Sequence, residues 1–160
     1  MEMIKIGGSN IALNYENKND KVLFILLGEA LTEIQCFETC IYSLLSGIQD
    51  NEKKITFIDS FEKNERKTLG QLIYDLDKYI KDENIKRNLI EVRDRRNYLV
   101  HNILKRYGWP LMSNEDYLKS IKEIVEIRDF INSSEPIITK YIRDNKILDI
   151  LIFEFNEKRK

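Results

Sequence analysis

The sequence is poor in residues that hold small proteins together through covalent bonds or metals. It has one histidine and two cysteines among 160 residues. A Cys/His zinc site could be built only from Cys36, Cys40, His101 and one carboxylate, so we expect no metal, and nothing else in the sequence indicates a cofactor. Two cysteines are also too few for a disulfide framework, and we expect both to be buried thiols.

Long apolar runs and a leader segment are missing as well. No run approaches the ~20 apolar residues that a membrane-spanning helix needs, and residues 1–10 lack a basic segment followed by an apolar one. We therefore expect a cytoplasmic protein that makes no membrane contact. With 42% hydrophobic residues, 33% charged residues and only two prolines, the composition is typical of a soluble protein rich in amphipathic helix.

Apolar residues recur at the three- and four-residue spacing of amphipathic helices. The stretches with this spacing, each predicted to be a helix, are residues 20–49, 69–81, 85–108 and 114–132. Thr68 and Ser113 stand where the N-caps of the second and fourth helices belong. The spacing therefore predicts four long helical segments.

The helical pattern breaks between and after these stretches. Residues 50–64 are charged and rich in turn formers, and they are predicted to be a connection. The Ser-Ser-Glu-Pro segment at 133–136 is predicted to kink or restart the fourth helix. Helical spacing then continues to about residue 152, with a terminal strand over 148–155 as the alternative.

The chain is expected to form a single domain after a short arm. Residues 1–19 contain Gly7-Gly8 and four asparagines, which predicts a short strand or a loosely held N-terminal arm. Residues 20–160 contain no repeat and no linker. We therefore expect an all-α fold, an up-and-down bundle of four to five helices.

Positive charge is concentrated on the third predicted helix. The chain carries a formal net charge of -1, so it offers no global attraction to nucleic acid. Residues 86–106, however, hold seven basic residues and two acidic ones, Glu91 and Asp94. The candidate RNA contacts in this segment are Arg93, Arg95, Lys105 and Arg106. The alternative is that these arginines pair with acids on a solvated helix face.

Arg96 and His101, in the middle of this basic segment, supply two groups that cleave a phosphodiester. Arginine stabilises developing charge on the phosphate, and histidine transfers protons near neutral pH. RNA brings its own nucleophile, the 2′-hydroxyl, so no metal is required. The alternative is that a single helical histidine is a packing or surface residue.

The spacing of these residues has a geometric consequence. Five residues turn a helix by ~140° and advance it by ~7.5 Å, so Arg96 and His101 do not share a face. Asn97 is four residues before His101 and does share its face, so it is the better candidate to orient the imidazole or the phosphate. A symmetric dimer that packs the third helices together would unite two copies of each residue, and we expect a homodimer through this helix.

The segment Arg96-Asn97-x-x-x-His101 resembles the signature of the HEPN superfamily, an arginine, a polar residue, three further residues and a histidine. Residues 68–73 upstream, Leu99-Val100 before the histidine and the long helix after it resemble small prokaryotic members. The resemblance covers roughly residues 20–140. It implies a helical bundle that dimerises and a metal-independent ribonuclease of the toxin or antiphage class, with Arg96 and His101 catalytic and Asn97 supporting them.

The resemblance also implies a partner and leaves alternatives open. In one subgroup a nucleotidyltransferase antitoxin modifies a tyrosine two residues after the histidine, and here that position is Ile103. An antitoxin of this kind is therefore an expected partner, although its usual target is absent. The alternatives are a noncatalytic module that binds a nucleotide or RNA or mediates dimerisation, and a structural protein in which Arg96 and His101 complete a buried polar network. Glu29, Glu33 and Glu38 on the first helix could supply a second acid or base, but Glu29 and Glu33 also fit an ordinary solvated stripe, and we assign a role to none of the three.

Overall fold

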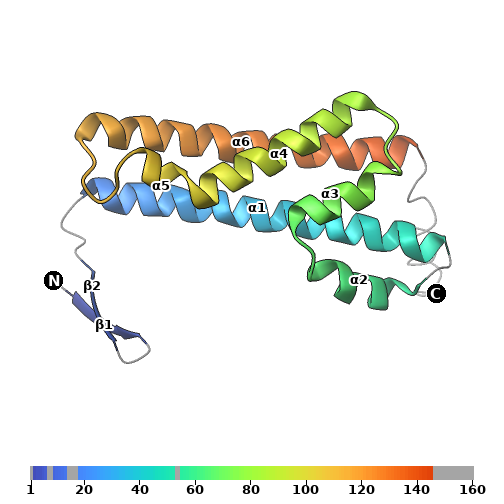
Figure 1. Ribbon diagram of the computed structural model, residues 1–160, viewed down its shortest axis with the longest axis horizontal. Helices are drawn as coiled ribbons and strands as arrows, with labels where there is room; N and C mark the ends of the chain where they lie inside the picture. Colours follow the sequence, from blue (N-terminus) through green and yellow to red (C-terminus); the bar gives the residue numbers. More distant parts are fainter. Residues whose placement is uncertain (1, 7–8, 14–17, 53–54, 146–160) are drawn as a thin grey trace, which may run out of the picture.

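The computed structural model describes residues 2–6, 9–13, 18–52 and 55–145. Within these ranges six helices form a bundle, shown in Figure 1. The helices are α1 (Lys18–Asn51), α2 (Phe57–Glu65), α3 (Leu69–Asp77), α4 (Glu83–His101), α5 (Ile103–Arg106) and α6 (Asn114–Asp144). The all-α bundle predicted from the apolar spacing is confirmed.

The N-terminal arm contains a hairpin. Strand β1 (Glu2–Ile6) pairs antiparallel with β2 (Ser9–Leu13), and Ile4 lies opposite Ile11. The short strand predicted for this arm is therefore a pair of strands. Among the described residues, no helix has a stretch long and apolar enough to cross a membrane.

The two longest helices, α1 and α6, lie side by side and run in the same direction (Figure 1). Glu29 near the start of α1 pairs with Arg128 of α6 at 2.8 Å, and Cys40 further along α1 lies 3.9 Å from Thr139 of α6. The residue numbers rise together on the two helices, as parallel packing requires.

Helix α4 runs in the opposite direction and packs against α6. Asn88 of α4 donates to Ser134 of α6 at 3.1 Å, whereas Tyr98 donates to Glu123 at 3.1 Å. The numbers rise on one helix and fall on the other, which is antiparallel packing. The three long helices therefore run up, down and up, while α2 and α3 pack against α1.

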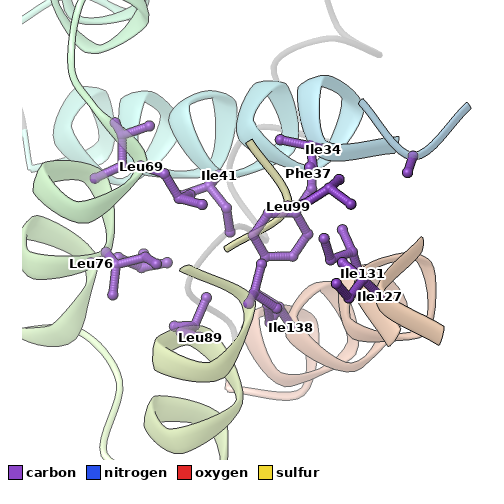
Figure 2. Close-up of a cluster of buried hydrophobic side chains, with 14 of the residues drawn as sticks. Ile34, Phe37, Ile41, Leu69, Leu76, Leu89, Leu99, Ile127, Ile131 and Ile138 are labelled. Carbon is purple, nitrogen blue, oxygen red and sulfur yellow. The ribbon is translucent and has the colours of Figure 1, made fainter. Parts of the chain in front are cut away.

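The core lies where α1, α3, α4 and α6 meet, and it consists mainly of leucine and isoleucine (Figure 2). Phe37 of α1 is 2% exposed, and Leu89 and Leu99 of α4 point toward the same centre. Each such side chain contributes about 1.5–3 kcal/mol by leaving water. The buried positions follow the apolar stripes predicted for the four long segments.

A helix forms where the sequence predicted a connection. Helix α2 occupies Phe57–Glu65 and is capped by Thr56, whose hydroxyl accepts from the backbone N–H of Asp59 at 3.3 Å. The prediction was wrong because the buried residues of α2 are polar. Ser60 and Asn64 are fully buried, whereas Phe57 and Phe61 are only half-buried, so the most buried side of the helix is not its apolar side.

Two predicted helix boundaries are also wrong. The fourth helix does not restart at residues 133–136, because α6 continues through Pro136 to Asp144. Pro136 is exposed, so the backbone bond that it removes lies on the solvent side, while Ile131 and Ile138 keep the helix packed. The third helix is likewise not continuous to residue 108. It ends at His101, and Asn102 leaves the helical region with φ -125° before the short α5.

The prediction that both cysteines are buried is wrong. Cys36 is exposed and Cys40 is half-buried, and both are free thiols. The core stripe of α1 passes through Phe37 and Ile41, so the cysteines lie on the flank of the helix and not beneath it. The alternatives for residues 148–155 lie outside the described residues.

Candidate functional site

Helix α4 positions the whole predicted motif. Its N-cap is Asp82, whose side chain accepts from the backbone N–H of Asn84 at 2.7 Å. Leu89, Val92 and Leu99 form its buried stripe. Arg96 lies four residues after Val92, so it emerges from that same stripe and its side chain leaves the helix toward α1.

The Arg96 guanidinium lies at the boundary between α4 and α1. Its Nε donates to Oε1 of Glu38 at 3.2 Å, and one terminal nitrogen, Nη1, donates to Oδ1 of Asn97 at 3.3 Å. The Arg96 and Glu38 side chains are only 28% and 26% exposed. A charge so close to the core needs a partner, which Glu38 provides.

His101 is the last residue of α4 and is exposed. Among the residues that the structure describes, its imidazole has no hydrogen bond and no ion pair. Because α4 is helical over the whole segment, His101 lies ~140° around the helix from Arg96. The structure thus brings Arg96 and Asn97 together, leaves Asn97 without a bond to His101, and turns Arg96 and His101 to different sides.

Two of the predicted RNA contacts are engaged by acids on their own helix. The Nε atom of Arg93 donates to Oδ1 of Asp94 at 2.9 Å, and its Nη2 atom lies 2.8 Å from the same oxygen in an ion pair. The same two atoms of Arg95 donate to one oxygen of Glu91 at 2.9 and 2.6 Å. Arg95 also lies over the ring of Phe130, 4.2 Å from its centroid. These contacts match the alternative to RNA binding, in which the arginines pair with acids on the helix face.

The other two predicted RNA contacts differ from each other. Lys105 is exposed and has no ion pair within the described part of the chain. Arg106 donates from Nη1 to the Tyr98 hydroxyl at 2.9 Å and to Glu123 of α6 at 3.2 Å. Of the four candidates, Lys105 is therefore the one whose charge is free.

Sequence reasoning missed a polar cluster around Glu123, here called the Glu123 cluster, which consists of Tyr98, Arg106, Tyr107 and Glu123. The hydroxyls of Tyr98 and Tyr107 donate to Glu123 at 3.1 and 2.8 Å, beside the Arg106 bond. Partial burial raises the pKa of both hydroxyls, and the Glu123 carboxylate raises it further, while Arg106 opposes the rise in the pKa of Tyr98. No spacing in the sequence reveals the cluster, because it joins α4 and the turn after α5 to a distant helix.

A shallow groove follows the boundary between α4 and α6. Its charged lining has four acids and two arginines, which are Glu91, Asp94, Glu123, Glu126, Arg87 and Arg95. The excess of carboxylates makes this groove a poor site for phosphates. Arg96 and His101 do not line it. The candidate site is therefore the surface around the end of α4 and not this groove.

The residues considered for zinc do not gather. No group of three or more histidine, cysteine, aspartate or glutamate side chains in the described ranges is arranged to hold a metal ion. Cys40 instead contacts Thr139, and burial raises the pKa of its thiol. Among the described residues, the surroundings of Cys36 and Cys40 therefore show no candidate metal site.

Comparisons with protein-family models, with curated proteins and with solved structures found no match to this chain. The resemblance to the HEPN superfamily therefore remains a prediction that depends on the motif and its helical setting.

Proposed function

We propose that this chain is a metal-independent endoribonuclease in which His101 transfers protons and Arg96 stabilises the charged phosphate. The observation that carries the proposal is the state of the two side chains. Within the described part of the chain, His101 is exposed and has no hydrogen-bond or ion-pair partner, and the Nη2 atom of Arg96 has no hydrogen bond. Both groups are therefore available to a ligand on one basic helix.

The proposed reaction needs only groups that the chain and the substrate supply. A neutral imidazole removes the proton of the ribose 2′-hydroxyl, whose oxygen attacks the phosphorus and displaces the 5′-oxygen. A protonated imidazole returns a proton to that leaving oxygen. The products are a 2′,3′-cyclic phosphate and a 5′-hydroxyl. Arg96 donates to the phosphate oxygens, where negative charge increases during attack.

The proposed active form is a homodimer through α4. One copy contains a single histidine, and its Arg96 lies on another side of the helix. A second copy would supply both the missing imidazole and a guanidinium from across the interface. Ile90 and Val100 of α4 are 43% and 42% exposed, and packing against a copy would cover this apolar surface.

RNA is the proposed substrate, and we expect Lys105 to be its principal phosphate contact outside the catalytic residues. Arg93, Arg95 and Arg106 contribute only if RNA displaces their present carboxylates. Because an uncontrolled ribonuclease damages its host, we propose a toxin or antiphage role, restrained by an antitoxin such as a nucleotidyltransferase. Growth arrest on expression of the wild type, and none with His101→Ala, is the expected result.

The decisive experiment compares the wild type with Arg96→Ala and His101→Ala on purified tRNA and mRNA in EDTA. We expect cleavage by the wild type, ends that carry a 2′,3′-cyclic phosphate, and no cleavage by either variant. Lys122→Ala removes an exposed charge on α6 and is the matched control, expected to cleave like the wild type. Equal thermal denaturation of all four proteins would exclude misfolding, and activity in either catalytic variant would refute the assignment.

A noncatalytic binding module is the second candidate, and one observation favours it. Arg96 and His101 lie ~140° apart around α4, and no side chain in the described ranges orients the imidazole, so one copy exposes polar groups for binding without uniting the two proposed catalytic groups. Tight RNA binding without turnover by the wild type would select this alternative. Absence of RNA binding at every salt concentration would instead indicate a structural protein.

A further inference from the structure

The contact between Arg96 and Glu38 differs from the other arginine contacts on α4. Arg93 and Arg95 each engage a neighbour on their own helix, and each directs both Nε and Nη2 at one carboxylate oxygen. Arg96 reaches α1, 58 residues away in the sequence, and gives Glu38 only its Nε. Asn97 accepts from Nη1 at 3.3 Å. The two contacts fix the side chain and leave Nη2 as the terminal nitrogen without a hydrogen bond among the described residues.

Glu38 is itself well placed to act as a fixed support. It follows Phe37, which is 2% exposed, and precedes Ile41, which is fully buried. These two side chains anchor that turn of α1 in the core. The Glu38 carboxylate thus approaches Arg96 from a rigid element, and with 26% exposure it has little freedom to move away.

We infer that Glu38 is a positioning residue that holds the guanidinium of Arg96 in the orientation in which its Nη2 atom meets the scissile phosphate. This inference depends on the proposed ribonuclease activity and adds a residue to it. With Nε held by Glu38 and Nη1 by Asn97, Arg96 presents the N–H groups of Nη2 to a phosphate. Without Glu38 the long side chain samples other rotamers and loses that alignment.

Two substitutions of Glu38 distinguish the loss of its hydrogen-bond acceptor from the loss of its charge. Glu38→Gln keeps an oxygen acceptor for the Arg96 Nε, whereas Glu38→Ala removes it. We expect Glu38→Ala to lower kcat about ten- to a hundredfold, the scale of a misplaced catalytic group. We expect Glu38→Gln to stay within about threefold of the wild type. The KM for RNA should not rise in either variant, because neither change removes a cation.

Two further substitutions on α1 serve as matched controls. Glu33→Ala removes the same charge about one turn earlier, where the carboxylate contacts no arginine among the described residues. Glu29→Ala breaks the ion pair with Arg128, which also joins α1 to another helix. Both should keep the wild-type kcat. They separate an effect on Arg96 from a general loss of charge or of stability.

The test is steady-state kinetics of the full chain on a fluorogenic RNA oligonucleotide of mixed sequence, with thermal denaturation in parallel. A lower kcat in Glu38→Ala alone, restored by Glu38→Gln, supports the inference. The inference would be overturned by a wild-type kcat in Glu38→Ala, by equal slowing in Glu29→Ala, or by a lack of rescue in Glu38→Gln. The proposed function would still stand in these cases if Arg96→Ala abolishes cleavage. A wild type that does not cleave RNA would overturn both.

Discussion

The two flanks of α4 use the same chemical groups in opposite ways. On the α1 flank, one carboxylate contacts Arg96 through a single nitrogen and leaves another nitrogen without a hydrogen bond. On the α6 flank, Glu123 receives hydrogen bonds from Tyr98, Tyr107 and Arg106. The α6 flank is a saturated network that joins elements, whereas the α1 flank keeps donor capacity for a ligand. We therefore place the candidate site on the α1 flank, where Arg96 keeps a donor nitrogen without a hydrogen bond among the described residues. The α6 flank has a structural role, because its polar groups bond to one another.

The largest expected effect on the free energy of unfolding comes from a core substitution beneath both flanks. Leu99 is 2% exposed and lies in the core beneath α4, between Tyr98 and the end of the helix. Leu99→Ala should lower the free energy of unfolding by about 2–5 kcal/mol, because it removes buried methyl groups and leaves a cavity. Urea denaturation measures this. Leu118→Ala, at a position 69% exposed on α6, should cost under ~0.5 kcal/mol, and similar losses in both variants would contradict the described core.

The next largest effect separates the flanks by stability. Glu123→Ala leaves two tyrosine hydroxyls without their acceptor and breaks the ion pair with Arg106, which should cost about 1–3 kcal/mol. Glu38→Ala breaks one ion pair of partly exposed groups and should cost at most about 1 kcal/mol. The comparison fails if urea denaturation ranks these two variants in the reverse order.

These two flanks also mark the limit of what the sequence predicts. Apolar spacing predicted α1, α4 and the core stripe on which Arg96 lies, because helix burial follows a period. It did not predict α2, whose buried Ser60 and Asn64 are polar. It predicted helix after Pro136 but left open a restart there, whereas α6 continues without interruption to Asp144. Residue spacing within one helix carries no information about which side chain of another helix will form a hydrogen bond with a polar group.

The candidate site divides in the same way. The motif predicted that Arg96 and His101 would lie on different faces of one helix, and five residues of regular helix are enough to fix that. The partner of Arg96 could not be predicted, because Glu38 is 58 residues away on another element. The pairing of Arg95 with Glu91 four residues earlier was foreseen as an alternative, since that contact is local.

A smaller stability effect, with a large effect on activity, tests whether the α1 flank serves function. The double variant Arg96→Met and Glu38→Leu replaces the ion pair with apolar groups of similar size. We expect the free energy of unfolding to change by less than about 1 kcal/mol in either direction, because an apolar pair often replaces a partly buried ion pair without loss. RNA cleavage should disappear. Cleavage at the wild-type rate would mean that the ion pair has no part in the activity.

The smallest expected effect concerns pH and sharpens the description of the α6 flank. Partial burial and Glu123 raise the pKa of Tyr98 and Tyr107 above the ordinary value of about 10, so the folded state holds these protons more tightly than the unfolded state. The stability from this source is present below pH ~10 and is lost as the pH rises through the folded pKa values. Glu123→Ala should lower both pKa values in an absorbance titration of tyrosinate and flatten the alkaline loss of stability. Glu126→Ala, an exposed acid on the same helix, is the matched control. An unchanged titration in Glu123→Ala would mean that burial alone sets the two pKa values, and the α6 flank would then owe its order to packing and not to the carboxylate.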